Sequence, residues 1–141
     1  MKFRFAISYL ACLIFLSSPA YADGTSVQVD AICNQTMSLL KAGKVGEAYD
    51  ASLGKSPLVS PTERSSLVGQ METAMKIFGP ASAYELVKEH RIGTLAVRRI
   101  YFLQHEKMVS RWEIDLVKTT GGWTVSYYGY DIKSQDWDAD D

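Results

Sequence analysis

Four extended segments follow one another in residues 84–131, whose sequence is YELVKEHRIGTLAVRRIYFLQHEKMVSRWEIDLVKTTGGWTVSYYGYD. Short turn signals, including Ile92-Gly93 and the glycines at 121–122, separate them. The predicted β-strands are residues 84–91, 94–105, 109–118 and 123–131. Gaps this short join only antiparallel neighbours, because a parallel pair needs a crossover of about a dozen residues or more. The stretch therefore predicts a four-stranded antiparallel meander.

Side chains along these strands alternate between two faces, and the turns predict a register with Tyr101 opposite Trp112 and Ile114 opposite Tyr127. One face collects mainly apolar side chains, namely Leu95, Val97, Tyr101, Leu103, Trp112, Ile114, Leu116, Trp123, Val125 and Tyr127. The other mixes charged and apolar side chains, namely Arg98, Ile100, Phe102, Arg111, Glu113, Asp115, Tyr128 and Tyr130. A slip of one residue would expose the apolar face. We therefore expect this register, with other elements covering that face.

Apolar residues at spacings of three and four predict two helices in the N-terminal half, at residues 27–42 and 45–53. Gly43 and Gly54 follow directly, where a helix commonly ends. The first helix carries an apolar stripe of Val29, Ile32, Cys33, Met37 and Leu40. The second presents Val45, Ala48, Tyr49 and Leu53 on one side.

A third helix begins at a capping box and runs to about residue 78. Ser60 is the expected N-cap, Pro61 fits the first helical position, and Glu63 can reach back to the amide of Ser60. Its predicted apolar stripe is Leu67, Met71, Ala74, Met75 and Phe78. The predicted fold class is therefore α+β, with three N-terminal helices packed on a curved four-stranded antiparallel meander.

Residues 1–22 have the parts of a secretory signal peptide. Lys2 and Arg4 precede an apolar run, and small residues end at Ala22, where we expect cleavage. A membrane anchor is an alternative, but the run is too short to cross about 30 Å of hydrocarbon at about 1.5 Å per residue. A lipoprotein signal around Cys12 would cut the apolar run in half. We expect an exported protein, periplasmic or secreted, without a membrane span after cleavage.

The remaining chain is predicted to form one domain at residues 23–133 with an acidic tail at 134–141. The 16 acidic residues outnumber the basic residues left after cleavage, so no basic surface for nucleic acid is expected. Cys33 is then the only cysteine and cannot form an internal disulfide; we expect it to be buried rather than to link chains.

The aspartates at 136, 138 and 140 mimic the start of a calcium loop, but neither the glycine nor the glutamate of such a loop follows. The chain also has no paired-cysteine, histidine–glutamate or phosphate-binding glycine motif. No metal and no cofactor is predicted.

The order of the elements is similar to the cone-shaped, cystatin-like α+β fold of the ketosteroid-isomerase and nuclear-transport-factor-like superfamily. More closely, the chain resembles small exported bacterial proteins of this superfamily that have no assigned function. The likeness covers roughly residues 27–131 and rests on Gly79-Pro80, Tyr84-Glu85-Leu86-Val87, residues 98–103, Arg111-Trp112, Lys118, Gly121-Gly122-Trp123 and Tyr127. It implies helices across the concave face of the sheet, a conical pocket beneath them and, in many members, dimerisation through the outer face.

Enzymes of this superfamily place acid and base groups inside the cone, often a tyrosine with an aspartate or a histidine with an aspartate. No such motif can be matched residue by residue here. Glu113 and Asp115 fall on the outer face in the predicted register, and His90 and His105 are interpreted as ordinary surface or edge residues. No catalytic residue is predicted.

The candidate ligand pocket consists of the polar and aromatic residues predicted on the inner face, namely Arg99, Tyr101, Trp112, Trp123 and Tyr127. Arg99 is either an anion clamp or a strand-end arginine whose head reaches solvent. The candidate partner surface on the outer face is Ile100, Phe102, Tyr128 and Tyr130. An open apolar patch usually marks a partner site, unless the charged neighbours shield it.

The sequence thus predicts an exported, non-catalytic binding module. It would take a small apolar ligand in the cone or a protein partner on the outer sheet face. One alternative is a homodimer of the cell envelope that binds no ligand, and another is an enzyme of the isomerase or hydratase type.

Overall fold

The computed structural model describes residues 24–54, 56–57 and 59–134. The predicted signal peptide and all of the predicted acidic tail except Ser134 lie outside the described residues. None of the described helices is long and apolar enough to cross a membrane.

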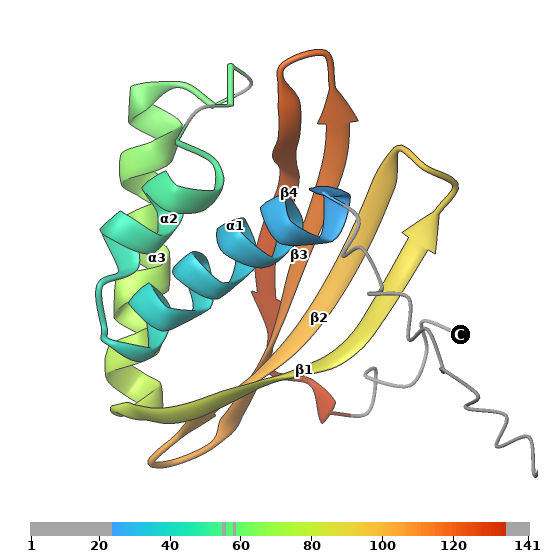
Figure 1. Cartoon of the computed structure of the whole chain (residues 1–141). Coiled ribbons are helices and arrows are strands. Elements are labelled where there is room, and N and C mark those ends of the chain that lie inside the picture. Colours follow the sequence, from blue (N-terminus) through green and yellow to red (C-terminus); the bar gives the residue numbers. More distant parts are fainter. Residues whose placement is uncertain (1–23, 55, 58, 135–141) are drawn as a thin grey trace, which may run out of the picture.

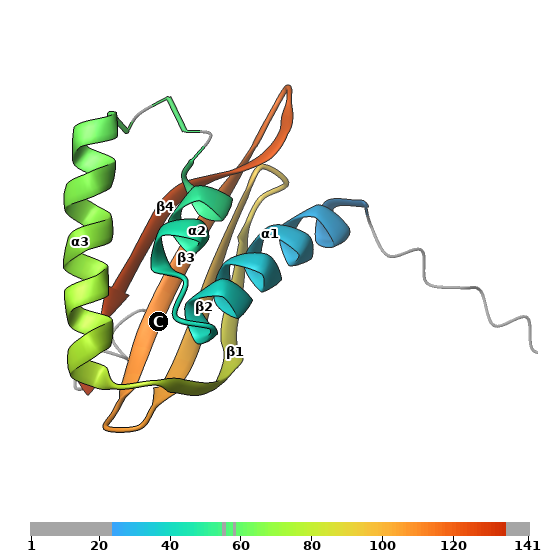
Figure 2. The ribbon, with the colours of Figure 1, turned by 90° about the vertical axis from the view of Figure 1, so that its left-hand side faces the viewer.

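Three helices lie on one side of the sheet, as Figure 1 shows. They are α1 (Gly24–Lys41), α2 (Val45–Ser52) and α3 (Pro61–Phe78). α1 crosses the strands obliquely, α3 stands at the side of the molecule, and α2 lies between them (Figure 2). This arrangement covers the apolar face of the sheet.

The capping box predicted at the start of α3 is present. The Ser60 amide donates to Glu63 Oε2 at 2.8 Å, and the Glu63 amide donates to Ser60 Oγ at 3.3 Å. The apolar stripe of α3 differs from the prediction in one place, because Val68 is 9% exposed and Leu67 is 38% exposed. Val68 faces Gly46 of α2, where an added Cβ would lie 3.8 Å from Val68 Cγ1, and this valine packs between the two helices.

The sheet is the predicted antiparallel meander, with strand order β1-β2-β3-β4. The strands are β1 (Ala81–Ile92), β2 (Ala96–His105), β3 (Val109–Thr119) and β4 (Gly122–Asp131). Leu95, which the sequence placed in the second strand, belongs to the β1–β2 turn and is 61% exposed. Gly93 turns the chain there with a φ of 58°, a conformation that glycine adopts at little cost.

The predicted pairing of β2 with β3 is confirmed, with Tyr101 opposite Trp112. The pairing of β3 with β4 is confirmed near the hairpin, where Leu116 lies opposite Val125. The inner face, which faces the helices, therefore carries the predicted apolar residues over most of the sheet.

A β-bulge at Ser126 overturns the predicted faces at the end of β4. The extra residue places Ile114 opposite Tyr128, where a regular register predicted Tyr127. Because side chains alternate, one extra residue turns every later side chain of the strand to the other face. Tyr127 consequently lies on the outer face and is 51% exposed, whereas Tyr128 is 6% exposed and Tyr130 packs against the core.

The core lies between the helices and the inner face. Trp112 is fully buried at its centre, with the rings of Tyr128 and Tyr130 at centroid distances of 5.4 and 5.1 Å. The predicted stripes of α1 and α2 contribute the buried Val29, Cys33, Met37, Leu40, Val45, Ala48, Tyr49 and Leu53. Cys33 is buried and free, as the sequence predicted.

Candidate functional site

The interior predicted as a ligand pocket is filled with side chains. Tyr101 and Trp112 are 2% and 0% exposed, so no space wide enough for water touches the Trp112 ring. Arg99 is 4% exposed and is engaged in ion pairs, and Tyr127 lies on the opposite face of the sheet. Trp123 stands apart from them, at the start of β4. The structure does not bring the five predicted residues together around one cavity.

Arg99 joins β2 to α1 and to β1. Its Nη2 lies 2.5 Å from Asp30 Oδ1 and 2.6 Å from Glu89 Oε2, and its Nε donates to Glu89 at 2.8 Å. Nη1 reaches the Tyr101 hydroxyl at 3.4 Å. The carboxylates of Asp30 and Glu89 thus occupy the guanidinium N–H groups that an anion clamp would offer to a ligand. The guanidinium does not reach solvent. Both sequence interpretations of this residue are replaced by an internal ion-pair cluster.

Arg99 and Glu89 of this cluster hold their charges at neutral pH. Burial alone would lower the pKa of Arg99, but its hydrogen bonds to the two carboxylates and the Tyr101 hydroxyl raise it. Burial likewise opposes ionisation of Glu89, yet its arginine partners outweigh burial and lower its pKa. Burial raises the pKa of the nearby Cys33 thiol, which is therefore a poor nucleophile.

His105 lies at the other end of β2 in a second polar cluster. Its Nδ1 is 3.1 Å from the Gly79 carbonyl oxygen and its Nε2 is 2.8 Å from Ser110 Oγ. Since a carbonyl only accepts, Nδ1 carries the proton and Nε2 accepts from the Ser110 hydroxyl. That hydroxyl accepts in turn from Trp112 Nε1 at 2.8 Å. The sequence predicted a surface or edge histidine, but His105 is 5% exposed because the Phe78 ring packs on it.

A histidine beside a serine is the pairing that nucleophilic catalysis uses. Here the serine is fully buried, so no substrate reaches it. Burial lowers the pKa of His105, partly offset by the hydrogen bond to Gly79. The cluster therefore fastens the end of α3 to the β2–β3 hairpin.

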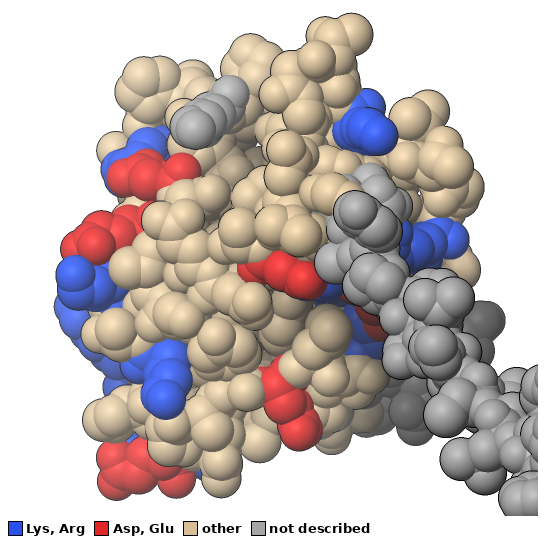
Figure 3. Space-filling model, viewed as in Figure 1, with Lys and Arg blue, Asp and Glu red and all other residues tan. Residues whose placement is uncertain are grey.

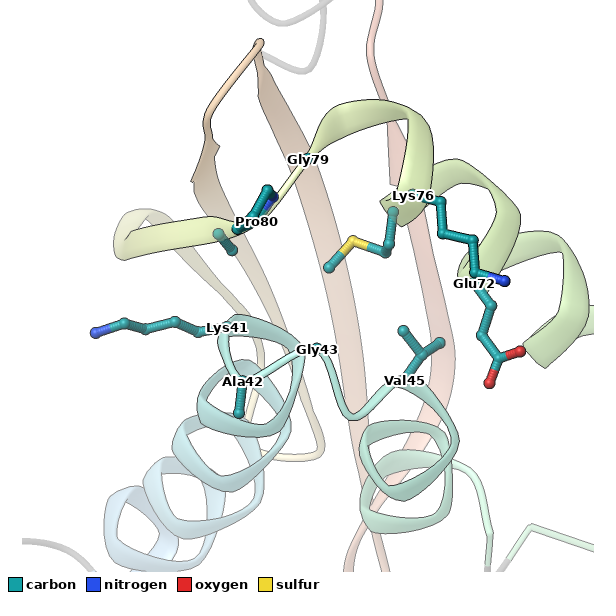
Figure 4. A pocket seen from close by; sticks show the side chains of 10 residues that line it. Lys41, Ala42, Gly43, Val45, Glu72, Lys76, Gly79 and Pro80 are labelled. Atoms are coloured by element: carbon teal, nitrogen blue, oxygen red, sulfur yellow. The ribbon is translucent and has the colours of Figure 1, made fainter.

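A groove of about 590 Å³ opens where the helix ends meet the start of β1 (Figure 4). Its lining comes from the α1–α2 connection, the last turns of α3, Pro80 and Ala81. Val45 points into the groove from α2, whereas Lys41 extends away from it (Figure 4). Among the described residues, none with an unsatisfied buried side-chain atom lines this groove. Lys41, Glu72 and Lys76 also line the groove, and all three are exposed. The groove thus offers apolar contact with exposed charged side chains around it.

On the helix side of the molecule, side chains of both charges gather along the edge formed by α2 and α3, and separate acidic patches lie nearer the centre (Figure 3). At the edge, Arg64 donates to both carboxylate oxygens of Asp50, at 2.7 and 2.6 Å. These charges neutralise each other and fasten α3 to α2.

The outer face of the sheet has none of the described helices over it (Figure 2). Arg98 donates to both oxygens of Asp115 at 3.0 and 2.9 Å and also lies 3.1 Å from Glu113. Of the predicted partner residues, Phe102 is half-buried here and Ile100 is 5% exposed beneath its neighbours. Tyr128 and Tyr130 belong to the inner face, as described above.

Tyr127 takes the place of the two misassigned tyrosines on the outer face. A side chain added to Gly129 would come within 2.5 Å of the Tyr127 hydroxyl and 2.9 Å of its ring. The ring therefore lies along the strand over Gly129, which is possible only because that residue has no side chain. The bulge that creates this arrangement has no distinct sequence signal apart from the glycine two residues beyond Tyr127.

No protein-family model matches the chain, and no curated protein matches it. A domain of unknown function with a cystatin-like fold from Nostoc punctiforme is similar over 78% of this chain and 78% of its own, with a TM-score of 0.54 and 12% identity. An NTF2-like protein with a cystatin-like fold from Novosphingobium aromaticivorans is similar over 79% and 83%, with a TM-score of 0.47 and 11% identity.

Likeness at such low identity concerns the fold alone, and neither protein's description names a ligand or partner. The predicted resemblance is confirmed at that level: the chain has a cystatin-like α+β fold, with three helices followed by a four-stranded antiparallel sheet.

Proposed function

We propose that this protein is an exported, non-catalytic protein-interaction module, and that its outer sheet face binds a second copy of the chain. The observation that carries the proposal is the outer face, over which no described helix lies (Figure 2) and which carries an exposed aromatic ring. Tyr127 is 51% exposed there, beside a network of partly exposed charges. Tyrosine and arginine are the residue types that dominate the energetics of protein interfaces.

The filled interior favours this proposal over a ligand in the cone. An apolar ligand needs a cavity of about 300 Å³ or more, and Trp112 at the centre of the predicted pocket is fully buried. The groove at the helix ends is large enough, but its charged side chains, Lys41, Glu72 and Lys76, are exposed rather than buried within it. A protein partner needs no cavity.

Charge on the outer face favours a second copy as the partner. The β1–β2 half carries Lys88 and Arg98 with Glu85, and the β3–β4 half carries Glu113, Asp115 and Asp131 with Arg111. Within one copy, Arg98 already bridges the two halves through its pairs with Glu113 and Asp115. A two-fold axis parallel to the strands would place the more basic half over the more acidic half of the other copy. Such an isologous contact is self-complementary.

The area of the face is also sufficient. Four strands about 4.8 Å apart, each ten residues long at about 3.3 Å per residue, span roughly 600 Å². Two such faces bury roughly 1,200 Å² in total, which is the lower end of stable protein interfaces.

Sedimentation velocity on residues 23–141 between about 1 and 100 µM tests the proposal. We expect a dimer for the unchanged protein and a monomer for Tyr127→Glu, because the buried carboxylate would lose hydration across the contact. Ile77→Glu is the matched control, since Ile77 is 64% exposed on α3, and it should remain dimeric. A monomeric unchanged protein, or a dimeric Tyr127→Glu, contradicts the proposal.

Export is a separate part of the proposal and rests on the signal-peptide pattern of residues 1–22. Protein recovered outside the cytoplasm should begin at Asp23. Recovery of a chain that retains its leader, in the cytoplasm or in a membrane, contradicts it.

A further inference from the structure

The Tyr127 ring is held over Gly129 on the outer face of the sheet. A Cβ added to Gly129 would come within 2.5 Å of the Tyr127 hydroxyl oxygen and 2.9 Å of the ring atom Cζ. The ring therefore occupies the place of the missing side chain, and Tyr127 is nevertheless 51% exposed. Part of the ring covers the strand, and the rest is open to a surface that approaches the sheet.

The strand register shows which residue stands at the same level on the far edge of the sheet. Gly129 lies opposite Glu113, Glu113 lies opposite Ile100, and Ile100 lies opposite Lys88. This cross-strand row therefore begins with a lysine on β1 and ends under the Tyr127 ring on β4. The ends are three strand spacings, or roughly 14 Å, apart, so the lysine and the ring of one chain do not meet.

The two-fold axis of the proposed dimer would reverse this row. An axis parallel to the strands and midway between β2 and β3 keeps every level but lays β1 of one copy over β4 of the other. Lys88 of each copy then faces the Tyr127 ring of the other copy, so the same contact forms twice. Facing sheets lie about 10 Å apart, a gap that a lysine side chain and an aromatic ring fill together.

We infer that the Tyr127 ring, held in place over Gly129, is a cation–π site for Lys88 of a second copy of the chain. The face of an aromatic ring is electrically negative and attracts an ammonium group that lies within about 6 Å of the ring centre. The inference rests on the proposed dimer and adds the residue pair that aligns its two sheets. Lys88 and Tyr127 are thus the residues that decide how one copy recognises the other.

Gly129→Ala tests the position of the ring and leaves both contacting residues in place. Gly129 does not have a positive φ, so alanine fits its backbone, but the added methyl group must displace the ring. By sedimentation velocity on residues 23–141, the dissociation constant of the dimer should rise at least about tenfold, because two contacts are lost. Gly121→Ala is the matched control, since its added Cβ meets only Thr119 Oγ1 at 3.7 Å, and it should leave the dissociation constant unchanged.

Substitutions of Lys88 test the cation. Lys88→Met keeps the length of the side chain without its charge and should also raise the dissociation constant at least about tenfold. Lys88→Arg keeps the charge and should associate as the unchanged protein does. Lys76→Met removes an exposed lysine of α3 and is the control for the change in net charge.

A mixture of two variants tests whether the contact is reciprocal. Lys88→Met and Tyr127→Ala each lose both contacts in their own dimers. A mixed dimer keeps one contact, between Lys88 of the Tyr127→Ala copy and Tyr127 of the Lys88→Met copy. With one variant fluorescently labelled, sedimentation should show the mixed dimer forming several-fold more tightly than either variant forms a dimer with itself.

The outcomes separate this inference from the proposed dimer. A monomeric unchanged protein overturns both. If the unchanged protein is a dimer, the inference alone is overturned when Gly129→Ala and Lys88→Met leave the dissociation constant unchanged. It is also overturned when Lys88→Arg weakens the dimer as much as Lys88→Met does, or when the mixed dimer has no advantage.

Discussion

The inner and outer faces of the sheet use the same chemistry in different surroundings, and Arg98 and Arg99 are the plainest example. They are consecutive in β2, and each pairs with two carboxylates. Arg98 on the outer face keeps a side chain that is 39% exposed, whereas the Arg99 side chain on the inner face is 5% exposed. The alternation of side chains between the two faces of β2 thus decides whether an arginine stays partly hydrated or is buried.

The difference teaches that the buried polar groups of this protein hold elements together. Arg99 ties α1 to the edge of the sheet, and His105 ties the end of α3 to the β2–β3 hairpin. Breaking a buried pair leaves a partner without compensation, whereas breaking an exposed pair lets water replace it. Neighbouring residues on the two faces therefore form matched experiments.

Arg99→Met should cause the largest loss of stability, about 3 kcal/mol. The substitution removes the buried guanidinium from both ion pairs and takes away the donor to the Tyr101 hydroxyl. The Asp30 and Glu89 side chains are 50% and 27% exposed, so water hydrates them in part and keeps the loss at the lower end for a broken buried pair. Urea unfolding measures the loss without the screening that a guanidinium salt adds. A loss below about 1 kcal/mol would mean that inner and outer ion pairs are equivalent.

His105→Asn should lower the free energy of unfolding by about 2 kcal/mol at pH 7.5 and remove part of its pH dependence. The folded protein lowers the pKa of this histidine from its ordinary 6.5, so the unfolded chain binds more protons in that range. The contribution of His105 to the free energy of unfolding is therefore complete above pH 6.5 and is lost as the pH falls from 6.5 toward the lower pKa of the folded protein.

Urea midpoints measured from pH 7.5 to 5.5 check this prediction. The control is His90→Asn, since His90 is exposed on β1, and it should keep the pH dependence of the unchanged protein. If the urea midpoint of His105→Asn changes with pH as steeply as that of the unchanged protein, another group causes the pH dependence.

Tyr128→Phe should stabilise the protein by about 1 kcal/mol, because the buried Tyr128 hydroxyl has no partner among the described residues. Burial of this group also raises its pKa. The same change at the adjacent Tyr127, which is 51% exposed, should have almost no effect. A destabilised Tyr128→Phe would show that the hydroxyl is hydrogen-bonded in solution.

Arg98→Met should have the smallest effect, below about 1 kcal/mol, because the Arg98 side chain is 39% exposed and water already screens its ion pairs with Asp115 and Glu113. Urea unfolding at low and at high salt measures it, and salt should reduce the difference further. A loss as large as that of Arg99→Met would indicate that the outer face is covered in solution, as a dimer requires.

Local patterns were enough to predict most of the fold. The capping box at Ser60 and the short turns between the strands act through neighbouring residues, so the sequence shows them directly. Alternation likewise placed Trp112, Ile114 and Leu116 on the buried face. The candidate site was predicted less well, because the bulge in β4 exchanged the faces of Tyr127, Tyr128 and Tyr130 and because packing with the helices filled the interior around Trp112.

By itself, the sequence determined the order of helices and strands, the antiparallel meander and the buried face of β2 and β3, because spacing, caps and tight turns are local properties of the chain. Tertiary packing alone decided that Ser126 bulges, that Tyr128 rather than Tyr127 packs on Trp112, and that Asp30 and Glu89 meet at Arg99. These contacts join residues far apart in the chain. Their free energy depends on the space left between helices and sheet, which no short stretch of residues specifies.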